Sequence, residues 1–200
     1  MTEKFTRLTA VAAPYEPVNV DTDQIIPARF LKFSREEGYG KFLFHDLRDK
    51  PGFILDQPPY DKARILVANE NFGSGSSREG AAYAFFDAGF RALIAPSFGD
   101  IFFNNCLKNG IVPARLPADV CRDLRQRLTQ APGTEITVDL ETQLVDGKHA
   151  FVVDPFFREM LLKGVNEIGL TLSMLPEIEA FERSYLAEAP WISQGLNPAR

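Results

Sequence analysis

The chain has 200 residues, of which 45% are hydrophobic, and its 27 acidic side chains outnumber its 22 basic ones. This length and composition fit one sizeable globular domain with its own core. The acidic balance argues against a nucleic-acid-binding protein, and no stretch approaches the roughly 20 apolar residues of a transmembrane helix. The N-terminus predicts no secretory signal, so the cytoplasm is the expected compartment.

The N-terminal part of the chain predicts one strand and then a long irregular stretch. Residues 5–13 predict a short strand. Residues 32–60 contain glycine, proline and charge without sustained periodicity. Because a loop of this length is usually functional or mobile, we expect a mobile loop without secondary structure of its own.

From residue 64 onward, short apolar runs alternate with amphipathic segments. The expected strands lie at residues 65–68, 92–95 and from 111, and the expected helices at 77–87, 97–109 and 117–128. Gly89 and Gly110 suit the ends of the first two helices. Since a helix separates each strand from the next, the strands are predicted to be parallel, with right-handed crossovers.

The C-terminal third predicts a hairpin followed by helices. Asp146 and Gly147 between alternating runs indicate a β-hairpin, and helices are expected at 155–164 and 175–188. Residues 187–200 are expected to be a loose tail, apart from Trp191, which is predicted to pack back. Residues 1–200 thus predict a single α/β domain with a parallel-centred sheet, flanking helices and an added β-hairpin.

The stretch NFGSGSSR, residues 71–78, lies between a predicted parallel strand and a helix. Ligands bind at this edge of open α/β sheets, and a helix N-terminus attracts anions. Gly73 and Gly75 permit a tight turn and a close approach of the backbone to a ligand. Arg78 adds a planar guanidinium that matches a carboxylate. The loop is therefore a candidate anion site, and the identity of the anion stays open.

Other readings of the same region are weaker. The loop lacks the Gly-Lys-Ser/Thr of a P-loop, and Arg78 stands where a dinucleotide fingerprint has its third glycine. The stretch APSFG, residues 95–99, lacks the first glycine of a serine hydrolase motif, and neither His45 nor His149 is assigned a role.

On composition alone, a purely structural role for the loop is the favoured interpretation, because capping serines are far commoner than catalytic ones. Ser76 or Ser77 could cap the following helix, with Glu79 completing a capping box. Arg78 would then be an ordinary surface charge.

Three blocks in order along the chain resemble one family. They are NVDTDQIIPARF (19–30), NFGSGSSREGAAYAF (71–85) and SFGDIFFNNCLKNGIVP (97–113). These blocks resemble the signatures of the aconitase superfamily, and in particular the small subunits of bacterial 3-isopropylmalate dehydratases. The resemblance extends from about residue 5 to residue 186. It implies a swivelling β/β/α domain that helps to interconvert 2- and 3-isopropylmalate in leucine biosynthesis, by dehydration and rehydration.

The resemblance also implies roles for individual residues. Ser76 is the expected base that removes the carbon-bound proton. Arg78 is expected to stabilise the alkoxide of Ser76 and to bind a substrate carboxylate. Asp23 is expected to orient the polar groups of the site. An Asx turn is the structural alternative for Asp23. The further substrate-binding positions are Thr22, Gly75, Ser77, Phe30 and Leu31.

Within that set, the resemblance gives the segment 28–34 the task of discriminating between substrates. Phe30 and Leu31 are expected to line a pocket for the isopropyl group. For Arg29 and Lys32, a solvated surface position is the expected state, and their contribution to the site stays open.

Loss of hydroxide from the substrate needs a Lewis acid, which the superfamily supplies as a [4Fe–4S] cluster on three cysteines. This chain has only Cys106, expected in the core, and Cys121, to which no role is assigned. The resemblance therefore implies that this chain binds no metal, that the cluster is in a separate large subunit, and that the chain is inactive alone.

The expected binding partners are the large subunit of the dehydratase and a small dicarboxylate substrate. Binding to nucleic acid or to a membrane is not expected. Two alternatives stay open. One is the small subunit of a related hydro-lyase, such as homoaconitase or methylmalate/citraconate hydratase. The other is a non-catalytic module that binds small anions.

Overall fold

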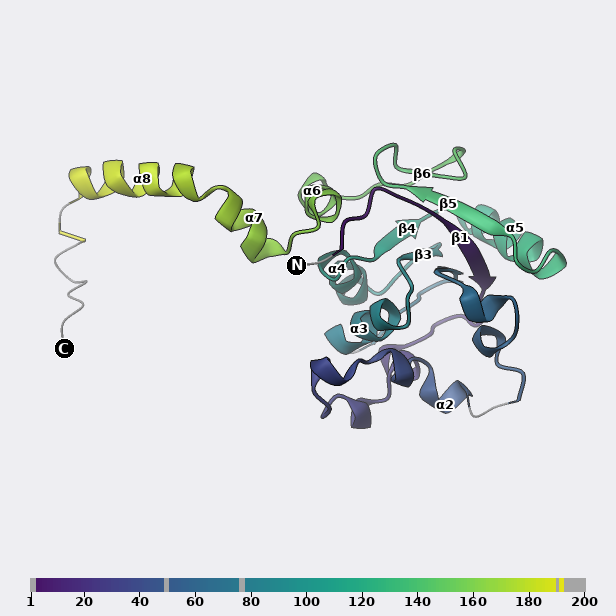
Figure 1. The fold of residues 1–200 in the computed structure, drawn as a ribbon. Coiled ribbons are helices and arrows are strands. Elements are labelled where there is room, and N and C mark those ends of the chain that lie inside the picture. Colours follow the sequence, from purple (N-terminus) through teal and green to yellow (C-terminus); the bar gives the residue numbers. More distant parts are fainter. Residues whose placement is uncertain (1–2, 49–50, 76–77, 190, 193–200) are drawn as a thin grey trace.

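A computed structural model describes the chain except for residues 1–2, 49–50, 76–77, 190 and 193–200. Its sheet has the strand order β4-β3-β2-β1-β5-β6-β7 (Figure 1). The strands are β1 (Arg7–Pro14), β2 (Ile65–Val67), β3 (Ala92–Ala95), β4 (Val112–Arg115), β5 (Glu135–Asp139), β6 (Leu144–Val145) and β7 (His149–Ala150). Strands β1 to β4 pair in parallel, whereas β5 runs antiparallel to β1 and leads into β6 and β7.

Longer helices connect the parallel strands and follow them. They are α3 (Glu79–Asp87), α4 (Asp100–Lys108), α5 (Ala118–Gln130), α6 (Pro155–Lys163), α7 (Glu167–Ser173) and α8 (Leu175–Glu188). Gly89 and Gly110 have φ values of 93° and 80°, the left-handed conformation expected just beyond a helix end. The predicted α/β domain with a parallel-centred sheet and flanking helices is confirmed.

Side chains of the central strands alternate between two apolar layers. Leu66 and Leu93 belong to one buried cluster, whereas Ile65, Val67 and Ile94 belong to the other. The first cluster also includes residues from α3 and from the segment that follows β1, and the second includes residues from α5 and α6. Burial on both faces explains why these strands appear in the sequence as continuous apolar runs.

The prediction that residues 32–60 have no secondary structure was wrong. The segment contains the 3-10 turns η2 (Arg35–Glu37), η3 (Gly40–Phe42), η4 (Ile54–Asp56) and η5 (Tyr60–Lys62), and the short helix α2 (His45–Arg48). Phe44 is fully buried and stacks on Tyr15, with 5.0 Å between ring centroids. The segment is held by aromatic contacts with distant parts of the chain, which leave no periodic pattern in the sequence.

The C-terminal third combines confirmed and corrected predictions. Asp146 and Gly147 have φ values of 50° and 66° and form the turn between β6 and β7, so the hairpin is confirmed. Helix α7 was not predicted; its N-cap is Asn166, whose side chain accepts a hydrogen bond from the Gly169 N–H at 2.8 Å. Trp191 is 68% exposed, so the prediction that it packs back was wrong.

Helices α7 and α8 project from the body of the domain (Figure 1). Helix α8 contains no buried residue. Deleting residues 174–200 is therefore expected to change the free energy of unfolding by less than about 0.5 kcal/mol in urea denaturation. As a control, Leu93→Ala in the core should cost about 2–5 kcal/mol. Loss of cooperative unfolding in the shortened chain would contradict this description.

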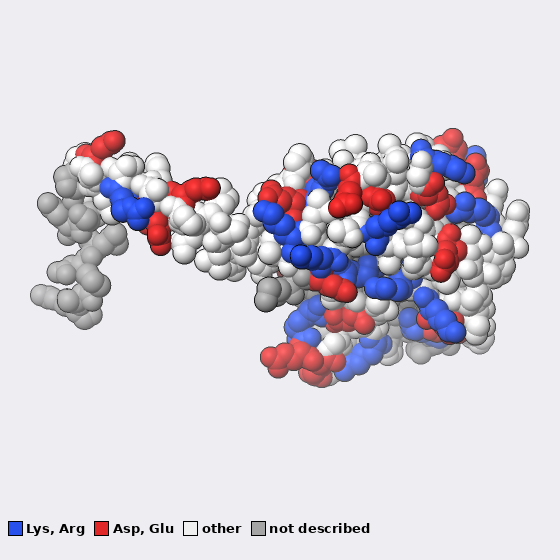
Figure 2. Space-filling view, turned by 45° about the horizontal axis from the view of Figure 1, so that its top comes forward, with Lys and Arg blue, Asp and Glu red and all other residues white. Residues whose placement is uncertain are grey.

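No helix in the described part of the chain is both long enough and apolar enough to cross a membrane. On the face seen in Figure 2, acidic and basic side chains are interspersed over the body.

Candidate functional site

The loops that follow β1, β2 and β3 lie side by side beyond the ends of their strands. Isolated bridges continue the parallel pairing there, between Asp21 and Ser74 and between Phe72 and Phe98. The Thr22 N–H donates to the Ser74 carbonyl at 2.9 Å, and the Gly73 N–H donates to the Val20 carbonyl at 2.7 Å. The Asp-Thr-Asp block and the glycine-serine loop therefore form one continuous backbone structure.

The glycines of the loop have distinct structural reasons. Gly73 has a φ of 73°, and a Cβ built there would lie 2.8 Å from Phe102 Cβ and closer still to the ring. Gly99 packs directly against the carbonyl of Gly73, which leaves no space for a side chain. Gly75 has a φ of 90° and is exposed immediately before the serines. The loop needs glycine for its backbone conformation and for its close packing.

Asp21 is a structural residue that sequence reasoning did not identify. Its Oδ1 accepts from the Gln24 N–H at 2.7 Å, while Gln24 Oε1 accepts from the Asp21 N–H at 3.3 Å. This reciprocal cap begins the short helix α1 (Thr22–Ile25). The spacing Asp21-x-x-Gln24 is the sequence pattern of a capping box and would have indicated this helix start. Asp23 Oδ1 accepts instead from the Ala28 N–H, five residues on, which is not the Asx turn considered for it. Thr22 is buried.

Asp23 and Arg78 connect the two motifs through their side chains. They form an ion pair, and Asp23 Oδ1 also accepts from the Ala28 N–H at 2.8 Å. Contact with Arg78 and then the Ala28 N–H lower the pKa of Asp23, so it is ionised at neutral pH. Arg78 is only 19% exposed, and the nitrogen that contacts Asp23 Oδ1 is its buried Nη1. A guanidinium carries five N–H donors, so Arg78 can hold Asp23 and also donate to an oxyanion ligand.

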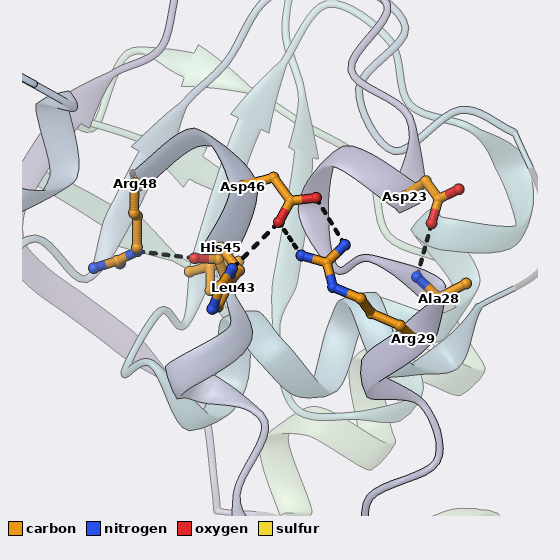
Figure 3. A network of polar contacts seen from close by, with 7 residues as sticks. All are labelled: Asp23, Ala28, Arg29, Leu43, His45, Asp46 and Arg48. Carbon is orange, nitrogen blue, oxygen red and sulfur yellow. Dashed lines mark hydrogen bonds and ion pairs between the residues drawn. The ribbon is translucent and has the colours of Figure 1, made fainter. Parts of the chain in front are cut away.

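Asp23 of this ion pair lines a cavity of about 410 Å³, whereas Arg78 is not among the described lining residues. The described residues that line it are Asp21, Asp23, Gln24, Pro27, Ala28, Arg29, Asp46 and Leu47. Figure 3 shows Asp23 near the start of the 3-10 turn η1 (Ala28–Phe30), with Arg29 reaching Asp46 of α2. Polar groups from two stretches of the chain, residues 21–29 and 46–47, thus line one cavity.

Phe30 and Leu31 do not line this cavity. Phe30 stacks on Phe42 with 4.3 Å between ring centroids. Leu31 packs so closely on α3 that its Cδ2 would lie 2.5 Å from a Cβ at Gly80. Both side chains are partly buried against the apolar cluster. Their contacts with Phe42 and with α3 hold them there, so the prediction that they line the substrate pocket is not borne out for this cavity.

The predicted residues Ser76 and Ser77 lie outside the described residues, between Gly75 and Arg78. Their capping role is therefore not tested. Glu79, the expected partner in that capping box, instead accepts a hydrogen bond from Asn109 Nδ2 at 3.0 Å.

The serine hydrolase reading gains no support from the described residues. Ser97 Oγ accepts from the Asn71 N–H at 2.8 Å, so this hydroxyl fixes the neighbouring loop. His149 is in β7, and His45 Nδ1 lies 3.2 Å from Asp46 Oδ1.

The cysteines do not fit an iron–sulfur cluster. Cys106 and Cys121 are fully buried in different apolar clusters, on opposite faces of the sheet. Burial raises the pKa of Cys106 well above its usual value and that of Cys121 to about 11, which disfavours thiolate ligands. Within the described part of the chain, no group of three or more His, Cys, Asp or Glu side chains could hold a metal ion.

This burial leads to a prediction about reactivity. The folded chain treated with iodoacetamide at neutral pH should remain unmodified, whereas the urea-unfolded chain should be alkylated at both Cys106 and Cys121. Mass spectrometry measures the difference. Rapid alkylation of either cysteine in the folded chain would contradict its buried, protonated state.

Comparison with known proteins first defines the class. Residues 2–119 match the family model described as the aconitase C-terminal domain, and residues 167–194 match the model described as the C-terminal domain of the 3-isopropylmalate dehydratase small subunit. A chain of this class with this site is a subunit of a hydro-lyase.

Individual relatives narrow the assignment further. The 3-isopropylmalate dehydratase small subunit of Granulibacter bethesdensis is 47% identical over 98% of this chain and 99% of its own length. The 3-isopropylmalate dehydratase small subunit of Gluconobacter oxydans is 49% identical over 96% of this chain and 98% of its own length. The crystal structure of 3-isopropylmalate dehydratase from Methanocaldococcus jannaschii matches with a TM-score of 0.64 and 25% identity, over 87% of this chain and 99% of the other. The chain belongs to the family of 3-isopropylmalate dehydratase small subunits.

Proposed function

We propose that this chain supplies the proton-transferring and carboxylate-binding half of an enzyme that interconverts 2- and 3-isopropylmalate in leucine biosynthesis. The observation that carries the proposal is the Asp23–Arg78 ion pair, which joins two sequence motifs beside a cavity of about 410 Å³. Family membership supports the reaction, because the relatives carry the name of this dehydratase.

Removal of the carbon-bound proton is the first chemical demand. Ser76 is the proposed base, since it occupies the serine position of the family's Gly-Ser-Ser-Arg motif. A hydroxyl is a weak acid, so its alkoxide needs nearby positive charge. The start of α3 and the guanidinium of Arg78 provide that charge. In the reverse direction the serine returns the proton to carbon.

Binding of the adjacent substrate carboxylate is the second demand. Negative charge develops on this carboxylate as the proton leaves, so fixed donors stabilise the transition state. Arg78 is the proposed donor, and Asp23 holds its guanidinium in place. Gly75 and Ser77 are proposed to add donors to the same oxygens, and Thr22 to support Asp23 from its buried position.

Selectivity for the alkyl group is assigned to the segment 28–34. Phe30 and Leu31 are proposed to act there by fixing the position of η1, since both pack on the core. One or two methylenes change discrimination by about 1–3 kcal/mol, so homoaconitate and methylmalate are close rivals as substrates. Exchanging residues 28–34 for those of another hydro-lyase should shift the ratio of kcat/KM between these acids.

Departure of hydroxide is the third demand, and the two cysteines of this chain do not meet it. We assign the Lewis acid, a [4Fe–4S] cluster, to a separate large subunit that binds this chain. The proposed compartment is the cytoplasm, where free buried thiols such as Cys106 and Cys121 persist in reduced form.

A pull-down from the native cell tests this assignment. The tagged chain should recover a larger polypeptide that contains iron and acid-labile sulfide, and the recovered complex should interconvert the two isopropylmalates. Recovery of the chain without any iron-containing partner, under anaerobic conditions that preserve clusters, would contradict the proposal. Binding of a dicarboxylate without turnover in the recovered complex would instead favour a non-catalytic anion-binding module.

A further inference from the structure

The cavity is lined by the guanidinium of Arg29, to which the family motifs assign no role. We propose that Arg29 is a second carboxylate-binding residue of the site and that Asp46 is the positioning residue that holds its guanidinium on the cavity wall. This inference rests on the proposed function, because it concerns the recognition of the same dicarboxylate.

The ion pair between Arg29 and Asp46 is bidentate. Arg29 Nη1 donates to Asp46 Oδ2 at 2.9 Å, and Nη2 pairs with Oδ1 (Figure 3). Two parallel contacts fix the plane of the guanidinium as well as its position. Arg29 and Asp46 are 55% and 50% exposed, and both line the cavity. Because the pair stays open to solvent, a ligand carboxylate is able to reach Arg29.

Neighbouring rings hold the pair in place. The Arg29 guanidinium lies 4.6 Å from the centroid of the Phe30 ring. The Phe30 ring in turn packs on the His45 ring, with 4.6 Å between the two ring centroids. The His45 Nδ1 lies 3.2 Å from Asp46 Oδ1. The turn η1 and the helix α2 are therefore fastened together at the point where Arg29 meets Asp46.

The cavity is lined by charges that give Arg29 a role. Its described lining includes three carboxylates, and Arg29 is the one cation among those described lining residues. A dianionic substrate would be repelled unless positive charge offsets these acids. Arg78 already pairs with Asp23, which also accepts a hydrogen bond from Ala28, the residue before Arg29. One acidic side chain thus connects the segments that carry the two arginines.

The first experiment uses the reconstituted complex. Arg29→Met should raise the KM for isopropylmalate about 10- to 100-fold, the loss expected for one charge-assisted hydrogen bond, with a smaller change in kcat. Inhibition by a branched dicarboxylate should weaken similarly, whereas inhibition by its monoamide should change little. Arg48→Met is the matched control, because Arg48 is on α2 but pairs with Asp56 away from the cavity lining. An unchanged KM in Arg29→Met would overturn the inference.

The second experiment tests Asp46 through Arg29. Asp46→Asn should raise KM about three- to tenfold in the wild-type background, a fraction of the effect of losing the charge-assisted bond itself, and should have no further effect beside Arg29→Met. An equal effect in both backgrounds, or a fall in KM, would contradict the positioning role. Should the wild-type complex lack turnover, the proposed function fails. Calorimetric titration of isopropylmalate into wild-type and Arg29→Met complexes still decides the inference, with equal affinities overturning it.

Discussion

Replacing Ser76 with alanine is expected to lower the kcat of the reconstituted dehydratase about 10²- to 10⁴-fold, the usual contribution of a general acid–base group. The loss follows because no other residue assigned to the site takes the carbon-bound proton in the proposed mechanism. KM should change little, since Arg78 still binds the carboxylate. Steady-state kinetics of the purified complex measures both constants.

Ser74→Ala is the matched control for this substitution. Ser74 is in the same loop, and it joins the loops through its backbone: its carbonyl accepts from Thr22 and its N–H donates to Val20. The control should therefore retain most of the turnover. Full activity in Ser76→Ala would remove the serine from the role of base, and a complex that fails to assemble would point to a structural role instead.

Replacing Gly73 with alanine is expected to destabilise the chain by about 2–5 kcal/mol, from backbone strain and overpacking together. The strain arises because Gly73 has a φ of 73°, and the overpacking arises because the new methyl group would meet Phe102 near its backbone. Phe102 is itself 2% exposed and has little freedom to move. Urea denaturation followed by circular dichroism measures the loss.

Gly89→Ala separates the two contributions. Gly89 also has a positive φ, of 93°, but a Cβ there would meet no atom within 4 Å. The control should therefore lose only the strain term of about 1–2 kcal/mol. Equal losses in Gly73→Ala and Gly89→Ala would show that the close packing of the loop on α4 does not contribute to stability.

The sequence was most informative where local pattern and burial coincide. Strands β2 and β3 are short apolar runs because both of their faces are covered. Gly89 and Gly110 marked helix ends because their backbone conformation is needed locally. These features leave a local pattern among residues that are adjacent in the sequence, so the sequence alone predicts them.

Features that depend on tertiary contacts were missed. The aromatic contacts of Phe44 organise residues 32–60, although nothing periodic marks that segment. The ion pair between Arg29 and Asp46 joins residues 17 positions apart, so Arg29 looked like a solvated surface charge. Asp23 and Arg78 were each selected by motif, but their pairing required the fold.

Turnover by the purified chain, measured alone and with its proposed iron-containing partner, shows whether this polypeptide is half of an enzyme. We expect no interconversion of 2- and 3-isopropylmalate by the chain alone, and interconversion once a cluster-bearing large subunit is added anaerobically. Interconversion by the solitary, metal-free chain would contradict the claim that this polypeptide is half of an enzyme.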